Sequence, residues 1–270
     1  MVESTIEHFN ELALKKLTFL KQSLARYFTY SMMAGVHIGF AIVLIFAIGG
    51  PLKAATNPGL KALMGASFGI ALALVIFAGS ELFTGNNMIF TIASLSKKVT
   101  WRDTLWLWVV CYFGNLAGSL LLAYGVGVSG IMNGTPGGEL VLITAAAKMQ
   151  APWMELFVRG ILCNMLVCLA VWSAARTKDD TAKLILLFWC LFAFIGSGFE
   201  HSIANMTLLG VGLFIPHDPL TVSWAGYARN LIPVTLGNII GGAVFIGAAY
   251  WYIASGALKK ESVSHDTGVN

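Results

Sequence analysis

The chain has 270 residues, of which 57% are hydrophobic and only 11% are charged. Soluble globular domains contain about 45–50% apolar and about 25% charged residues, so this composition excludes an ordinary water-soluble domain. The formal net charge is +4, but the Lys and Arg residues are scattered between apolar stretches and do not cluster with aromatic residues. This pattern argues against a nucleic-acid-binding protein.

Residues 1–25 form a separate N-terminal segment. Charged residues occur throughout it, so it lacks the continuous apolar core of a cleavable signal peptide. Apolar side chains recur in it at helical spacing, at Ile6, Phe9, Ala13, Leu17, Leu20 and Leu24. We therefore expect an amphipathic helix that lies along the membrane surface or against the rest of the protein.

Six apolar stretches follow, each of about 20 residues or more, which is the length that crosses a hydrocarbon core of about 30 Å. They cover residues 27–50, 62–95, 104–128, 154–175, 184–213 and 229–254. We predict an all-α membrane protein with one transmembrane domain of six helices over residues 26–257. Residues 258–270 are polar and predict a disordered cytoplasmic tail.

The basic residues predict the orientation of these helices. Of the 17 Lys and Arg residues, only Lys53, Lys61, Lys148, Arg159 and Arg229 lie on one side of the predicted membrane, and the other twelve lie on the opposite side. Loops rich in Lys and Arg stay in the cytoplasm, so we expect both termini to be cytoplasmic.

The four cysteines give no sign of a disulfide framework or a metal site. Cys111, Cys163, Cys168 and Cys190 all lie inside apolar stretches, and none shows the paired spacing of metal ligands. We expect neither a metal nor a cofactor.

Stretches 62–95 and 184–213 are too long for one simple crossing, and each contains polar residues that lipid would penalise. Residues 79–88 and 196–206 both begin with Gly-Ser and end with Asn-Met, and Thr84 and His201 stand at the same offset from the opening glycine. We therefore predict that the second and fifth helices are interrupted at matching places.

The similarity extends to a repeat of three helices. Residues 114–119 and 237–242 both read Gly-Asn-x-x-Gly followed by a small residue, a pattern typical of close helix packing. The halves, about 26–128 and 154–254, must face opposite ways because each contains an odd number of crossings. Inverted repeats with paired interrupted helices indicate a substrate path near the middle of the membrane.

Five blocks of the chain resemble signatures of the formate/nitrite transporter family: residues 79–85, 159–164, 167–172, 198–206 and 230–238. The resemblance implies an aquaporin-like protomer in a homopentamer of a bacterial-type inner membrane, with one path through each subunit. The Asn-Pro-Ala motif of water channels is absent, which fits this family. Leu82 to Asn86 are more similar to the nitrite branch than to formate channels.

The resemblance also implies which residues form the path. His201 matches the family's central histidine, and Thr84 matches the threonine that faces it. Lys148 and Asn164 match polar residues near the path, and Glu200 matches the acid beside the histidine. The apolar constrictions on either side of the histidine correspond to Phe68, Leu72, Leu82 and Phe194.

These residues suggest how an anion could cross. Stripping water from an anion between apolar side chains is expensive, whereas a neutral acid passes more cheaply. We hypothesise that Lys148 raises the local anion concentration, and that His201 meets the anion as a cation or hands it a proton. Nitrite is the first candidate, with formate and hydrosulfide as alternatives, and passive and proton-coupled transport both remain open. A membrane enzyme is disfavoured because no nucleophile stands at usable spacing from a base.

Overall fold

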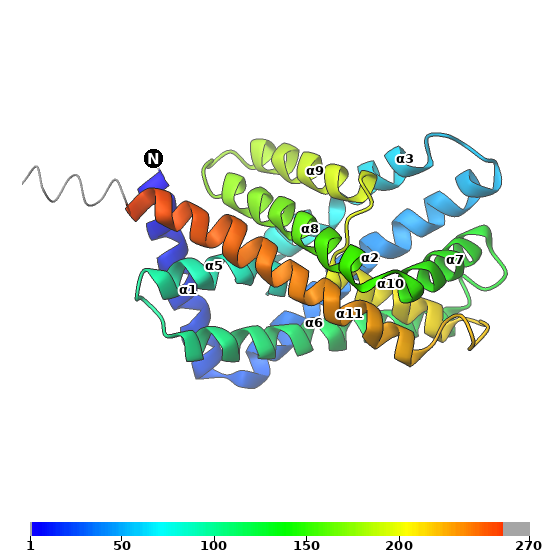
Figure 1. Cartoon of the computed structure of the whole chain (residues 1–270), viewed down its shortest axis with the longest axis horizontal. Helices are drawn as coiled ribbons and strands as arrows, with labels where there is room; N and C mark the ends of the chain where they lie inside the picture. Colours follow the sequence, from blue (N-terminus) through cyan, green and yellow to red (C-terminus); the bar gives the residue numbers. More distant parts are fainter. Residues whose placement is uncertain (1, 256–270) are drawn as a thin grey trace, which may run out of the picture.

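The computed structural model describes residues 2–255, and every regular element in this range is helical (Figure 1). The predicted tail at 258–270 lies outside the described residues. The first half contains α1 (Val2–Gln22), α2 (Leu24–Ala54), α3 (Leu60–Ser67), α4 (Ile70–Ala73), the π-helical segment η1 (Leu74–Gly79), α5 (Phe83–Leu95), α6 (Trp101–Ser129) and α7 (Pro136–Gln150). The second half contains α8 (Trp153–Ala174), α9 (Asp180–Gly196), α10 (Ser202–Phe214), α11 (Trp224–Ile240) and the π-helical segment η2 (Gly241–Ala248).

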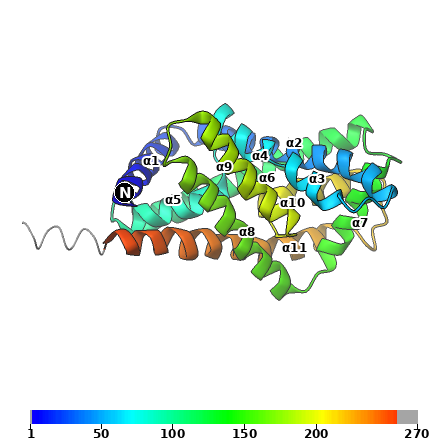
Figure 2. The same ribbon diagram turned by 90° about the horizontal axis from the view of Figure 1, so that it is seen from above.

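Five helical segments of the described range are long and apolar enough to cross a membrane: Leu24–Ala54, Leu60–Gly79, Trp101–Ser129, Trp153–Ala174 and Trp224–Ser255. The sixth predicted stretch, 184–213, is divided between α9 and α10, which have 17 and 13 residues. The described chain begins and ends at the same end of the bundle (Figures 1 and 2), as an even number of crossings requires.

Both predicted interruptions are present. The interrupted helix of the first half ends at Gly79 and resumes at Phe83. The interrupted helix of the second half ends at Gly196 and resumes at Ser202. Gly79 and Gly198 have φ angles of +82° and +75°, a left-handed conformation that glycine adopts without a steric penalty. A Cβ at Gly79 would also lie 2.6 Å from the hydroxyl oxygen of Tyr30, so a larger residue there would have to displace that side chain.

The structure corrects the register of the repeat. Gly79 and Gly198 are each followed two residues later by a glutamate and seven residues later by an asparagine. These are Glu81 and Asn86 in the first half and Glu200 and Asn205 in the second. Leu82 and His201 are both the residue before a 13-residue helix. Thr84 and His201 stand at the same offset from the two Gly-Ser pairs, but they are not equivalent in the structure, because Gly196-Ser197 precedes the left-handed glycine of the second half.

The two halves interlock. In each half the first and third helices pack together, α2 on α6 and α8 on α11. The segment after each break crosses over to the other half, so that α5 packs on η2 and α8, and α10 packs on α6 and α2. The paired glycines pack as predicted, since a Cβ at Gly118 would overlap the carbonyl of Met32 and a Cβ at Gly241 that of Ile161. Both breaks therefore lie in the interior of one bundle.

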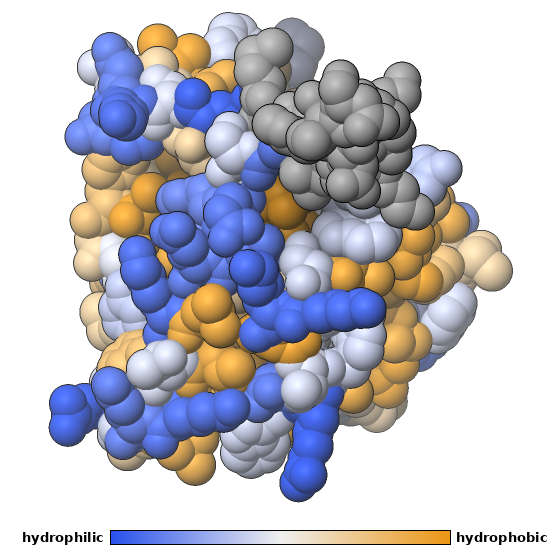
Figure 3. Space-filling view, turned by 90° about the vertical axis from the view of Figure 1, so that its left-hand side faces the viewer, coloured by the Kyte–Doolittle hydropathy of each residue, from blue (hydrophilic) through white to orange (hydrophobic). Residues whose placement is uncertain are grey.

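Helix α1 lies across one end of the bundle and packs against α5, α2 and α6 (Figures 1 and 2). Its apolar face is buried, and Phe9 stacks on Trp172 at 5.5 Å between ring centroids, while Trp172 stacks on Tyr250 at 4.1 Å. Of the two predicted positions, the structure has the helix against the bundle. Figure 3 views this end, where hydrophilic side chains gather with hydrophobic ones around them.

The sequence reading missed α7. Its 15 residues are too few to cross a membrane, so a search for long apolar stretches passes over it. The helix begins after Thr135, whose hydroxyl accepts a hydrogen bond from the Gly138 backbone at 3.1 Å. It packs on α2, α10 and α11 and carries Thr144 and Lys148.

Candidate functional site

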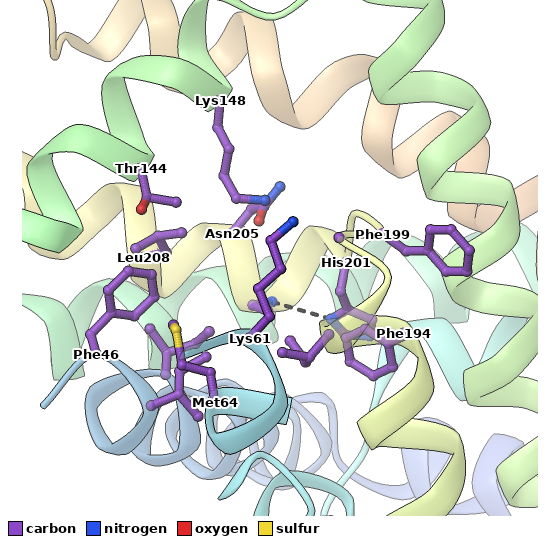
Figure 4. Close-up of a pocket in the computed structure, with 15 residues that line it drawn as sticks. Phe46, Lys61, Met64, Thr144, Lys148, Phe194, Phe199, His201, Asn205 and Leu208 are labelled. Atoms are coloured by element: carbon purple, nitrogen blue, oxygen red, sulfur yellow. Dashed lines mark hydrogen bonds between the residues drawn. The ribbon is translucent and has the colours of Figure 1, made fainter. Parts of the chain in front are cut away.

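A cavity of about 220 Å³ lies between α2, α3, α7, α9 and α10 (Figure 4). We call it the outer cavity. Most of its lining is apolar, with Ile, Phe, Leu and Met side chains. The polar side chains that line it are Lys61, Thr144, Lys148, His201 and Asn205. Its wall is therefore apolar with a few convergent polar groups, which is the usual composition of a small-molecule site.

A second, inner cavity of about 10 Å³ lies beyond His201 and Phe194, which line both spaces. Its lining includes all four predicted constriction residues, together with Ile38, Val167, Leu191 and His201. The rings of Phe68 and Phe194 meet edge to face at 5.4 Å. The structure thus brings the four residues together around one space, which is about the smallest that holds a single water molecule.

His201 lines both cavities and contacts Thr84, which lines neither. The Nε2 atom of His201 lies 3.0 Å from Thr84 Oγ1, although 117 residues separate them in sequence. The other ring nitrogen, Nδ1, accepts a hydrogen bond from the backbone N–H of Ala204 at 3.2 Å and so caps α10. Because a backbone N–H can only donate, Nδ1 carries a lone pair, and the neutral ring has its proton on Nε2.

This arrangement links the imidazole to a hydroxyl that has a proton to donate. The neutral imidazole donates from Nε2 to Thr84 Oγ1, whose own hydroxyl proton has no acceptor among residues 2–255. The ring of Phe194 stacks on that of His201 at 5.9 Å and an interplanar angle of 22°, which limits rotation of the imidazole. Of these two residues, only His201 lines the cavities, so an anion that reaches this point meets the imidazole first, with the Thr84 hydroxyl directly behind its Nε2 atom.

Lys148 and Glu200 form a buried ion pair beside His201. The Nζ atom of Lys148 lies 2.6 Å from Glu200 Oε1, and Asn205 donates to Glu200 Oε2 at 2.6 Å. The side-chain oxygen of Asn230 accepts a hydrogen bond from Asn205 at 2.9 Å, and its amide nitrogen donates to the Lys148 carbonyl at 3.0 Å. Glu200 therefore neutralises the charge of Lys148, which the sequence alone did not reveal.

The first break contains a matching cluster that the sequence reading missed. Lys16, from α1, lies 2.9 Å from both Glu81 Oε2 and Asn86 Oδ1, and Asn86 donates to Glu81 at 3.0 Å. Tyr27 also donates to Glu81 Oε2, at 3.0 Å. The sequence signal that could have found the cluster is the five-residue spacing from Glu to Asn, which the second half repeats.

Two asparagines of the Gly-Asn motifs hold the broken backbone. Asn115 accepts from the Phe83 N–H at 2.9 Å and donates to the carbonyls of Ser31 and Glu81, both at 2.8 Å. Asn238 makes the same set in the other half: it accepts from the Ser202 N–H at 2.8 Å and donates to the carbonyls of Gly160 and Glu200 at 2.8 and 2.9 Å. Backbone groups released by a break inside a membrane need such partners, because lipid offers none.

Asn164 lies behind Thr84 and is not among the residues that line either cavity. Its amide donates to the carbonyls of Thr84 at 3.1 Å and Asn238 at 2.6 Å. It therefore ties α8 to the first turn of α5 and to α11, and fixes the backbone that carries Thr84.

Comparison with known proteins identifies the family. The profile described as Formate/nitrite transporter matches residues 3–252, nearly the whole chain. The chain belongs to the formate/nitrite transporter family. Among its relatives, the nitrite transporter NirC of Escherichia coli (strain K12) is 46% identical over 233 residues, covering 82% of this chain and 81% of that protein.

Two solved structures extend this family match to the fold. One, described as an FNT family ion channel, has a TM-score of 0.87 at 40% identity and covers 93% of this chain and 98% of its own. A pentameric formate channel with formate bound has a TM-score of 0.76 at 31% identity, covering 86% of this chain and 98% of its own. The predicted fold, an all-α aquaporin-like membrane protein with interrupted helices, is confirmed, and membership of a transporter family sets the membrane enzyme aside.

Proposed function

We propose that this formate/nitrite transporter passes nitrite through a path in each protomer of a homopentamer. The observation that carries the proposal is the contact between His201 and Thr84. It joins the two breaks beside an outer cavity that carries a few polar groups and an inner constriction that is apolar apart from His201. The greater identity to the nitrite transporter, 46% against 31% for the formate channel structure, supports nitrite as the first candidate. Formate is the second candidate, supported by the fold match to a channel that holds it.

The two cavities impose different demands on an anion. The outer cavity offers ammonium, hydroxyl and imidazole groups, so an anion can enter with part of its hydration replaced. The inner cavity is lined, apart from His201, by apolar side chains and has space for about one water molecule. A bare anion would pay a large desolvation cost there, whereas the neutral conjugate acid would not.

His201 is the group placed to change the charge of the passing species. To bind an arriving anion, the Nε2–H of His201 must turn from Thr84 Oγ1 to the anion, and a nearby anion favours the protonated ring. Protonation at Nδ1 would break the cap on Ala204, so the imidazolium costs one hydrogen bond and returns readily to the neutral form. A proton given to nitrite at this point would let the neutral acid cross the constriction.

The orientation belongs to the same proposal. Of the 15 Lys and Arg residues within 2–255, ten lie on the side of α1, so both termini face the cytoplasm of a bacterial-type inner membrane and the outer cavity opens away from it. Lys16 and Lys148 then stand on opposite sides of the constriction, each paired with the glutamate of one break.

The test is uptake of nitrite, formate and hydrosulfide by one reconstituted preparation at two pH values. We expect nitrite to enter fastest and its uptake to rise at the lower pH. His201→Asn keeps a polar side chain but cannot carry the proton, so it should abolish the pH-dependent part of the flux. Unchanged flux and pH profile in this variant would contradict the role of the imidazole, and faster formate uptake would reverse the order of substrates.

A further inference from the structure

The outer cavity contains one cationic side chain that the second break does not neutralise. Lys61 and Lys148 reach into it from α3 and α7 (Figure 4). Lys148 is paired with Glu200 at 2.6 Å, so together these two residues add no net charge. Within residues 2–255, no carboxylate lies within ion-pair distance of Lys61. The net positive charge of the cavity lining therefore resides on Lys61.

The position of Lys61 is not explained by the stability of its own helix. It is the second residue of the eight-residue α3, where the positive end of the helix dipole disfavours a cation. Its side chain makes no hydrogen bond to any described residue, and the residue is exposed. A solvated lysine that is free of partners and lines a cavity leading to His201 can act on anions outside it.

We propose that Lys61 is the residue that draws anions into the outer cavity, and that Lys148 mainly balances Glu200. This inference rests on the proposed function, because it assumes that anions enter by this cavity. An unpaired charge at a cavity mouth raises the local concentration of counter-ions and speeds their entry. It acts on capture at low substrate concentration and leaves the crossing of the constriction unchanged.

The charge predicts a specific kinetic pattern. Lys61→Gln should lower nitrite uptake at low substrate concentration about fivefold at 10 mM ionic strength, with the maximal rate unchanged. The difference should shrink to less than about twofold at 0.5 M, where the Debye length falls to only a few ångströms. Lys61→Arg should restore the rate. The matched control is Lys53→Gln, an exposed lysine of the same side that does not line the cavity, and it should behave as the unmodified protein does.

A thiol experiment separates charge from shape in one preparation. Lys61→Cys is made with Cys190→Ser, because Cys190 is the cysteine that is not fully buried. After reconstitution, a membrane-impermeant methanethiosulfonate adds either a trimethylammonium or a sulfonate group to the cysteine. We expect the trimethylammonium adduct to recover the rate at low substrate concentration and the sulfonate adduct to lower it further.

The outcomes distinguish the two proposals. Equal rates for the two adducts, or equal rates for Lys61→Gln and Lys53→Gln at low ionic strength, would overturn the role of Lys61 while nitrite transport stands. If the unmodified protein carries neither nitrite nor formate, the proposed function fails and this inference falls with it. A rate that follows the order positive, neutral, negative supports both.

Discussion

Breaking the ion pair between Lys148 and Glu200 should destabilise the protein far more than breaking an exposed pair of the same length. The N–O distance is 2.6 Å both in this pair and in the pair of Arg159 with Glu155. The side chains of Lys148 and Glu200 are only 20% and 4% exposed, whereas those of Arg159 and Glu155 are 44% and 51% exposed. The two pairs therefore differ mainly in burial.

The expected magnitudes follow from what each substitution leaves behind. Lys148→Met leaves a buried carboxylate with Asn205 as its remaining donor. Loss of one partner from a buried pair costs about 3–5 kcal/mol, and the partial exposure of Lys148 places this case near about 3 kcal/mol. Glu200→Gln should cost about 1 kcal/mol, because the amide still accepts from Asn205 and Lys148 can extend to water.

The double variant tests the interaction itself. Lys148→Met with Glu200→Gln leaves no buried unpaired charge and should cost about 2 kcal/mol, so the two single effects exceed the double effect by about 2 kcal/mol. The same cycle with Arg159→Met and Glu155→Gln should show a coupling below about 0.5 kcal/mol, as exposed pairs do.

The assay is reversible unfolding in mixed detergent and SDS micelles, with helical circular dichroism as the signal and free energies compared across each four-member cycle. A coupling below about 0.5 kcal/mol for the buried pair would refute the view that Glu200 neutralises Lys148. Equal couplings in the two cycles would show that burial does not decide the strength of the pair.

Two further predictions concern the break and the constriction. Asn238→Ala removes three buried hydrogen bonds to backbone groups. At about 0.6 kcal/mol per bond in membrane proteins, it should lower the free energy of unfolding by about 2 kcal/mol. A loss below about 0.5 kcal/mol in the same assay would contradict the role of Asn238. Phe194→Ala opens the boundary between the cavities and should admit anions larger than nitrite, such as acetate, into proteoliposomes, whereas Phe188→Ala, which lines neither cavity, should not. Acetate exclusion that survives Phe194→Ala would remove Phe194 from the constriction.

Much of the fold was predictable because a membrane imposes simple local rules. Long apolar stretches reveal the crossings, and polar residues inside them reveal the breaks, since lipid tolerates neither charges nor unpaired backbone. Glu81, Glu200 and His201 stand out on this ground alone. The same search did not find the 15-residue α7 because this helix is too short to cross the membrane. The position of Lys148 on a helix was therefore not predicted either.

The register of the repeat shows the limit of pattern matching. Two Gly-Ser pairs align in the sequence, but the backbone aligns Gly79 with Gly198, because the left-handed turn occurs at these residues. Backbone conformation decides which glycine of the second half is equivalent to Gly79, and the amino-acid sequence does not state that conformation.

The sequence by itself determined that this chain is a membrane protein with paired broken helices, because hydropathy and the cost of buried polar groups are properties of short segments. Only the tertiary structure decided which groups meet: His201 with Thr84, Lys148 with Glu200, and Lys16 with Glu81. Each of these contacts joins residues that are more than fifty positions apart, brought together by the interlocking of the two halves and the packing of α1. The electrostatic balance of the path, with Lys148 neutralised and Lys61 left unpaired, depends on those contacts and so exists only in the folded protein.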